Sequence, residues 1–345
     1  MMGVALWIGI IFLFLFTPNV TQFFKKESLN VFMWSGIVDP KLFDEFQKET
    51  GIHVNVSYFG GNEELIVKLL ATKGYGYDMI VPSDYAVQFL IDHNLLKELD
   101  KSHLDFYEKI DPVFLGHYFD PENKYSIPAE WYVLGLGINK NYFKQGLPLA
   151  SWATVFDPNI MPQNIGLTND SRETINLAIN YKYGKLRAIN GHEVKEVTKI
   201  LQRQKQHAEA YTDFRGDFLL EAGNCPVVVI SNQYAWKSVQ ENEHLEFVIP
   251  KEGTFLNLEN YVIPKTSTKE QEVYKLMNFL FERKGQEHNF NEYSWLSTRK
   301  DADYMYSIPA LKDSIETIRA GKAQLFRNVL TDEQVNDIWL AVKGG

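Results

Sequence analysis

The chain has 345 residues, of which 45% are hydrophobic and 23% charged, and it carries a formal net charge of −9. Its length is sufficient for a large core and two domains. The acidic balance argues against a nucleic-acid phosphate backbone as partner and weakly favours cationic ligands. The single cysteine, Cys225, excludes an internal disulfide.

The N-terminal segment contains an unbroken apolar run from Val4 to Phe16, followed by the breaker "TPN". The run is too short to cross a bilayer comfortably and has the length of a signal-peptide core. We therefore expect residues 1–26 to direct export across a membrane. Because no Lys or Arg precedes the run and no A-x-A site follows it, cleavage and retention as an anchor are both left open. A buried N-terminal helix is the alternative.

Strands and helices then alternate along the chain. Segment 29–34 is predicted to be a strand, and the next helix begins with Asp39 as N-cap, has Pro40 in its first turn and stops at Gly51. Further strands are expected at 53–59 and 77–83, and further helices at 62–74 and 84–94. This rhythm predicts a parallel sheet covered by helices.

A long aromatic and glycine-rich extended segment, Tyr125–Asn139, interrupts the alternation, and a second extended segment is expected at Glu259–Ser267. A second α/β set lies between them, and a helix at 269–285 and a helical tail from Asp301 follow. The order predicts two α/β lobes joined by crossings. We assign 28–134 plus 260–300 to the first lobe and 135–259 plus 301–345 to the second.

Polar and aromatic residues follow the predicted strands at Trp34, Ser83, Thr168 and Ser231. Ligands of open α/β sheets bind beyond the carboxyl ends of the strands, so we expect these positions to share one cleft. Each also has a local explanation, since Trp34 could be a core aromatic and Ser83 an N-cap. Convergence of several such residues favours a site.

The stretch "TNDSRET", residues 168–174, places two carboxylates in the first turn of a predicted helix. Asp170 would be the N-cap, and Glu173 could reach back to complete a capping box. Alternatively, the two carboxylates converge on a cation. The readings are compatible, because one oxygen of Asp170 can cap the helix while the other faces the cleft.

Sequence motifs of enzymes and metal sites are missing. The eight histidines have no metal-ligand spacing, and the chain has no P-loop, no G-x-S-x-G elbow and no dinucleotide fingerprint. We predict no catalytic residue, no cofactor and no metal. Asp170 and Glu259 could form a glycosidase pair, which leaves an exported hydrolase as an alternative.

The residue types suit a ligand with ammonium groups separated by methylenes. A buried ammonium needs an anionic acceptor, which Asp and Glu supply through charge-assisted hydrogen bonds. Flat aromatic walls favour methylenes and inner amines, and each cation–π contact contributes about 0.5–2 kcal/mol. Ser, Tyr and Gln can set the remaining hydrogen bonds.

Nearly all of the chain after the leader resembles the periplasmic spermidine/putrescine-binding proteins, the solute receptors of polyamine ABC importers. The resemblance rests on "FMWSGIVDPKLFDEFQKETGIHV", "YDMIVPSDYAV", "FDPENKYSIPAEW", "GLGIN", "LTNDSRE", "PKEG", "KLMNFL" and "ETIRAGKAQ". It implies a type II periplasmic-binding-protein fold whose lobes close over the ligand. By position it implies ligand contacts from Trp34, Ser83, Tyr85, Asp170, Glu173, Glu259, Tyr293 and Gln324, with Ser294 as the alternative to Tyr293.

The chain departs from the family pattern where aromatic walls are expected. Ile37 replaces a tyrosine, and Ser231 and Asn257 each replace a tryptophan. Asp213 lies near a family serine and could add a carboxylate. With each missing wall contributing about 1 kcal/mol, affinity could fall by two orders of magnitude, or the preferred amine could differ.

These observations predict a non-enzymatic, exported periplasmic receptor that delivers putrescine or spermidine to the membrane permease of an ABC importer. The resemblance implies a monomer, and no nucleic-acid partner is expected. One alternative keeps the fold but binds another small ligand, such as an organic cation, an amino acid or a metal. Others are the exported hydrolase and a sensor whose closed form docks on a signalling partner.

Overall fold

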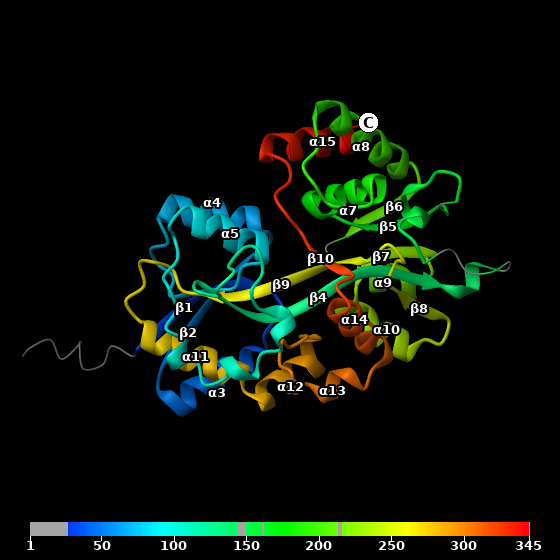
Figure 1. Ribbon diagram of the computed structural model, residues 1–345. Coiled ribbons are helices and arrows are strands. Elements are labelled where there is room, and N and C mark those ends of the chain that lie inside the picture. The colour runs from blue at the N-terminus through cyan, green and yellow to red at the C-terminus, as the bar shows by residue number, and fades with distance from the viewer. Residues whose placement is uncertain (1–26, 144–145, 147–149, 161, 213–215, 345) are drawn as a thin grey trace, which may run out of the picture.

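The computed structural model describes residues 27–344, except 144–145, 147–149, 161 and 213–215. The expected export segment and Asp213 therefore lie outside the described residues. Figure 1 shows the elements gathered into two α/β lobes, with two long strands running across the middle. In the described part of the chain, no helix is both long and apolar enough to span a bilayer.

The first lobe has the predicted alternation. Its central strand pairs in parallel with its two neighbours. The first helix begins after Asp39, whose side chain accepts from the Lys41 N–H, and ends at Gly51, which has a left-handed φ of 77°. The elements are β1 (Ser28–Trp34), α3 (Pro40–Thr50), β2 (His53–Phe59), α4 (Asn62–Thr72), β3 (Met79–Ile80) and α5 (Asp84–Asp92).

The second lobe is built around β5, which pairs in parallel with β6 and β7. Three short 3₁₀ turns precede the crossing strand β4 (Ser126–Asn139), at Lys101–His103, Tyr107–Lys109 and Pro112–Phe114. A fourth, Lys140–Tyr142, follows it. The lobe comprises α6 (Ala153–Phe156), β5 (Ile165–Thr168), α7 (Ser171–Tyr183), α8 (Gly191–Lys205), β6 (Ala208–Thr212), α9 (Asp217–Glu221), β7 (Val227–Ser231), α10 (Asn232–Glu241) and β8 (Leu245–Val248).

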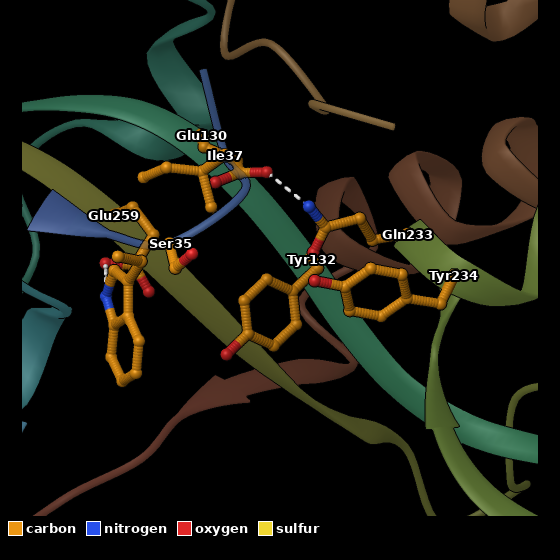
Figure 2. A pocket seen from close by; sticks show the side chains of 8 residues that line it. Ser35, Ile37, Glu130, Tyr132, Gln233, Tyr234 and Glu259 are labelled. Carbon is orange, nitrogen blue, oxygen red and sulfur yellow. Dashed lines mark hydrogen bonds between the residues drawn. The ribbon is translucent and has the colours of Figure 1, made fainter. Parts of the chain in front are cut away.

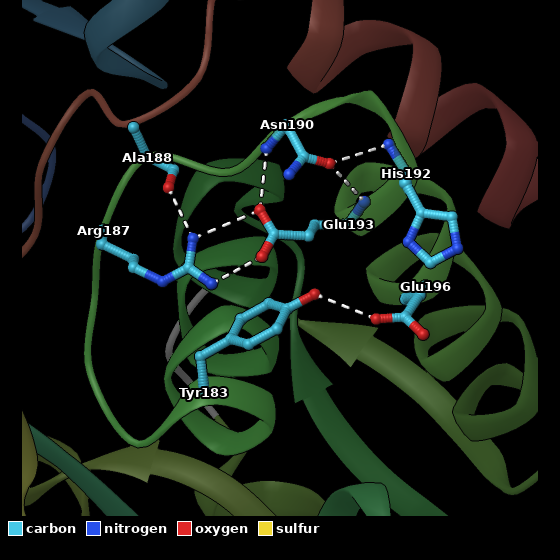
Figure 3. Close-up of polar contacts among 7 residues, drawn as sticks. All are labelled: Tyr183, Arg187, Ala188, Asn190, His192, Glu193 and Glu196. Atoms are coloured by element: carbon cyan, nitrogen blue, oxygen red, sulfur yellow. Dashed lines mark hydrogen bonds and ion pairs between the residues drawn. The ribbon is translucent and has the colours of Figure 1, made fainter.

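Helix α8 begins with a complete capping box, shown in Figure 3. The Asn190 side chain accepts from the backbone N–H groups of His192 and Glu193, and the Glu193 carboxylate accepts from the Asn190 N–H at 2.9 Å. Arg187 donates to the same carboxylate at 2.6 Å. These bonds, that of Arg187 first, lower the pKa of Glu193 to about 2.

Two long strands, β4 (Ser126–Asn139) and β9 (Thr254–Val262), are antiparallel neighbours, and every residue in them is buried. The sheet order is β2-β1-β3-β9-β4-β7-β5-β6, so this pair connects the two lobes (Figure 1). The predicted extended segment at 125–139 is confirmed. The second crossing begins and ends five residues earlier than the predicted 259–267.

Glycine in β4 permits close packing between strands. A Cβ atom at Gly135 would lie 2.5 Å from the ring of Phe247 on the neighbouring β8. Real Cβ atoms do not approach this closely, so any side chain there would displace the ring. The glycine-rich "GLG" of the sequence therefore has a packing role.

The C-terminal part returns toward the second lobe. Its elements are α11 (Glu270–Phe281), α12 (Arg283–Tyr293), α13 (Asp303–Tyr306), α14 (Pro309–Arg319), β10 (Ala323–Leu325) and α15 (Asp332–Gly344). The predicted all-helical tail is corrected by β10, which pairs in parallel with the start of β9. Helix α14 contacts α10, and α15 contacts α7 and α8. The assignment of 301–345 to the second lobe stays a prediction.

One extended hydrophobic cluster fills both lobes and the crossing strands, and a smaller one lies among α9, α10, β7 and β8. Cys225 belongs to the smaller cluster and is fully buried. Burial raises the pKa of its thiol to about 11. An inert packing role for this cysteine follows.

Candidate functional site

The carboxylate of Glu259, on the crossing strand β9, accepts hydrogen bonds from the end of β1 and the start of α5 in the first lobe. Trp34, the last residue of β1, donates its indole N–H to Oε2 at 2.9 Å. Ser83 donates its hydroxyl to Oε1 at 2.7 Å. Ser83 is the N-cap of α5 by position, but its side chain makes no capping bond. Its hydroxyl therefore orients Glu259.

A pocket of about 420 Å³ opens beside this group. Two carboxylates line it, and Gln233 donates its amide to the Oε1 of Glu130 at 2.6 Å (Figure 2). Glu130 and Glu259 lie opposite each other in the register of β4 and β9. The lining residues are Trp34, Ser35, Ile37, Glu130, Tyr132, Gln233, Tyr234 and Glu259.

A second pocket adjoins the first. It has an empty volume of about 1150 Å³ and shares Trp34, Ser35 and Tyr234 with the first pocket. Asp170 lines it from the second lobe and Glu63 from the first. Trp34 thus lies between an acidic group on the crossing strands and a second acidic group at the start of α7.

Asp170 caps helix α7 as predicted, and its Oδ1 accepts from the Glu173 N–H at 2.8 Å. The predicted second bond of the capping box, from the Asp170 N–H to the Glu173 carboxylate, is replaced, because this N–H donates to the Thr168 hydroxyl instead. Glu173 is instead 2% exposed, and its Oε2 has no hydrogen-bond partner. An acid buried in this way costs free energy in the absence of a cation.

Five carboxyl groups in or beside the two pockets have raised pKa values. Withdrawal from solvent raises the pKa of Glu259 to about 8 and that of Asp170 to about 6. Burial, followed by the charge of Asp170, raises the pKa of Glu173. Burial and the charge of Glu259 raise the pKa of Asp84 and Glu130. A cation placed among these groups would favour their ionised forms.

Tyr85 is buried at the start of α5, and its hydroxyl has no partner. The Arg172 guanidinium lies 5.6 Å from the centre of its ring. Arg172 donates to Asp332 at 2.7 Å. This arginine contacts the first lobe through Tyr85 and the C-terminal segment through Asp332, and its ion pair is with Asp332, not Glu173.

Five predicted site residues do not line either pocket. Ser83 donates to Glu259, Tyr85 and Glu173 are buried nearby, and Tyr293 and Gln324 line other pockets. Tyr293, together with Ser294, lines a neighbouring pocket that also includes Ser35 and Tyr234. Gln324 on β10 lines a separate pocket with Tyr118 and Leu256 and donates to Asn180 at 2.8 Å. The structure therefore brings together Trp34, Ser83, Asp170 and Glu259, with Tyr85 and Glu173 adjoining, but not Gln324.

The positions that depart from the family pattern have different surroundings. Ile37 lines the first pocket. Ser231 and Asn257 are buried, and Ser231 Oγ and Asn257 Oδ1 have no partner. Tyr132 and Tyr234 supply aromatic rings to this pocket instead (Figure 2).

Sequence reasoning missed five residues that line the first pocket: Ser35, Glu130, Tyr132, Gln233 and Tyr234. The available signal was the acid in "SIPAEWYVLGLGIN", the only charged residue of an otherwise apolar and small-residue strand. In the described part of the chain, no group of three or more His, Cys, Asp or Glu side chains is arranged to hold a metal ion.

Two α/β lobes, a pair of crossing strands and a polar pocket against Trp34 define the class of two-lobed solute-binding proteins. The model of the family described as bacterial extracellular solute-binding protein matches residues 41–313, and the chain belongs to this family. The expected family and the expected two-lobe fold are thereby confirmed.

Individual relatives support the same placement. The spermidine/putrescine-binding periplasmic protein 1 of Haemophilus influenzae is 31% identical over 262 residues, covering 75% of this chain and 72% of the relative. The spermidine/putrescine-binding periplasmic protein of Escherichia coli is 29% identical over 255 residues, with coverages of 74% and 73%. The crystal structure of a spermidine/putrescine ABC transporter substrate-binding protein from Streptococcus pneumoniae is 26% identical, with a TM-score of 0.75 and coverages of 92% and 99%.

Proposed function

We propose that this chain is an extracytoplasmic receptor that binds a polyamine, putrescine or spermidine, in the joined pockets around Trp34 and delivers it to an ABC-type permease. The main support is the composition of these pockets. Carboxylates and aromatic rings line both, and among the described lining residues none is basic. The similarity to spermidine/putrescine-binding proteins supports the same ligand class.

The two acidic groups match the two ends of an alkyl diamine. Glu259 would accept one ammonium group and Asp170 the other, each through charge-assisted hydrogen bonds. Trp34 lines both pockets, so its ring would cover the methylene chain between them. Glu173 and Asp84 would add negative potential behind the ligand.

Binding of this kind couples to closure of the lobes. Asp170 belongs to the second lobe, whereas Trp34 and Ser83 belong to the first, so a ligand that contacts both stabilises the closed arrangement. We infer that the protein is not an enzyme, that it acts as a monomer without a nucleic-acid partner, and that residues 1–26 export it to the periplasm. A membrane permease would receive the closed form.

Isothermal titration of the purified protein with putrescine and spermidine tests the proposal. We expect saturable binding of at least one amine and no binding of 1,4-butanediol, which has the same carbon chain without charge. Near-ultraviolet circular dichroism establishes that the protein is folded. Absence of binding heat with both amines at several temperatures, in folded protein, would refute the polyamine function.

A further inference from the structure

Glu130 is an acid in the middle of a fully buried strand. It is 1% exposed, and its Oε1 accepts from the Gln233 amide at 2.6 Å. An amide donor compensates a buried carboxylate only partly, because it carries no positive charge. Tertiary packing alone would favour an apolar residue here, as at the neighbouring Ala129 and Trp131. A role in recognition accounts for its presence.

Glu130 and Glu259 both line the 420 Å³ pocket, which a single head group of a ligand can enter. The two side chains come from adjacent strands at positions that are register partners, and Figure 2 shows Glu130 turned toward Gln233 and Glu259 on the other side of Ile37. No basic residue is found among the described residues that line it. Two carboxylates therefore belong to one pocket.

The pocket offers more acceptors than one ammonium can use. Oε1 of Glu130 already accepts from Gln233, and the two Glu259 oxygens accept from Ser83 and Trp34. Each carboxylate oxygen can accept a second hydrogen bond, and Gln233 retains its carbonyl oxygen. An ammonium has three donors on one nitrogen, whereas a guanidinium has five donors in a planar fork. A planar cation also stacks on aromatic faces, and Trp34, Tyr132 and Tyr234 line this pocket.

We propose that Glu130, held by Gln233, and Glu259 form a subsite for a guanidinium group, so that the preferred ligand is an aminoalkyl guanidine rather than a simple diamine. Its amino end occupies the adjoining pocket at Asp170, and its methylenes lie along Trp34. This inference rests on the proposed function and specifies the ligand and a specificity-determining residue, Glu130.

The experiment compares two ligands that differ only at one end. 4-Aminobutylguanidine and 1,4-diaminobutane share four methylenes and one ammonium, so the ratio of their dissociation constants isolates the second head group. Isothermal titration should show at least tenfold tighter binding of the guanidine. In Glu130→Gln, which keeps the side-chain shape, this ratio should fall to about one.

Asp170→Asn is the matched control, because both ligands place an ammonium at Asp170. It should weaken both ligands by a similar factor and leave their ratio unchanged. Gln233→Met is a second route, since it removes the bond that orients Glu130 and should lower the ratio. Circular dichroism and thermal midpoints show whether each variant is folded.

Equal affinity for the two ligands, or a preference for the diamine or for spermidine, would overturn the guanidinium subsite while leaving the polyamine function standing. A guanidine preference that survives in both Glu130→Gln and Gln233→Met would overturn the assignment to these residues. Absence of binding by every cation would overturn the proposed function and this inference together.

Discussion

Helices α7 and α8 begin with the same pattern, an Asn or Asp N-cap followed three residues later by Glu, and the two glutamates have opposite surroundings. Glu193 is bonded to the Asn190 N–H and to Arg187. Glu173 is buried, with Oε2 unpaired, although Asp170 caps α7 as Asn190 caps α8. The capping signature fixes where a helix starts but does not determine what its glutamate does.

The difference lies in the neighbours of each helix start. At α8 a basic residue and solvent stabilise the carboxylate, and the pKa of Glu193 is lowered. At α7 other acids lie nearby, and the pKa of Glu173 is raised. One glutamate stabilises the fold, and the other is held in an unfavourable environment that a cation would relieve.

The largest effect is expected for Glu173→Gln. Loss of this negative charge should weaken amine binding by about 100-fold, roughly 2.7 kcal/mol, without lowering the stability of the ligand-free protein. Titration calorimetry and urea unfolding measure the two quantities. Glu193→Gln is the matched control and should lower the thermal midpoint while leaving affinity unchanged. The reverse pattern would contradict the comparison.

The pH dependence of stability should have opposite signs for the buried pocket acid Glu259 and for Glu193 at the start of α8. A raised folded-state pKa contributes stability below the unfolded value, and this stability is lost as pH rises through the folded value. For Glu259 that window runs from its ordinary 4.5 to about 8. For Glu193, with a lowered pKa, stability is instead lost as pH falls from 4.5 to about 2.

Urea unfolding of the ligand-free protein should therefore show a decrease on the order of 2 kcal/mol between pH 5 and pH 8. A saturating amine should reduce this decrease, because it stabilises the ionised carboxylates. Glu259→Gln should flatten the same curve. A ligand-free protein whose stability rises steadily to pH 8 would show that the buried acids do not govern this range.

Asp170→Asn separates capping from charge at one residue. Asn is as good an N-cap as Asp, so the unfolding free energy should change by less than about 0.5 kcal/mol. Amine affinity should fall about tenfold, since the neutral amide loses the charge-assisted bond. Parallel unfolding and titration measure this. Unchanged affinity together with lower stability would reduce Asp170 to a capping residue.

The smallest effect is expected for Asn190→Ala. Removal of this N-cap should lower the unfolding free energy by about 1 kcal/mol, because the His192 and Glu193 N–H groups lose their acceptor. Amine affinity should stay the same, since α8 begins away from both pockets. A loss of binding in this variant would mean that α8 communicates with the site.

Local signals made much of the fold predictable. Asp39, Pro40 and Gly51 fix the ends of α3 through side-chain capping, a fixed φ and a left-handed φ, all of which act within a few residues. Strand β10 was missed because its three residues are stabilised only by pairing with Thr254–Leu256, far away in sequence. The start of β9 was missed because a strand buried on both faces shows no alternation.

The site was predictable only in part for the same reason. Trp34, Ser83 and Asp170 stand at strand ends or helix starts, where sequence pattern and topology agree. Glu130 and Tyr132 lie inside β4, and only the three-dimensional sheet places them beside Glu259. Gln324 was assigned to the site only from its position in the family resemblance, which could not reveal that its side chain donates to Asn180.

Because β4 and β9 run through both lobes, they would lie near the hinge axis of a closing motion. Atoms near a rotation axis are displaced least, so Glu130, Tyr132 and Glu259 would move little when one lobe rotates against the other. Asp170, which lies farther from these strands in the second lobe, would move farther. One end of a ligand would thus bind to preformed geometry in the open protein. Rotation of the lobe would then add the contact with Asp170 only for molecules that already fit the first position.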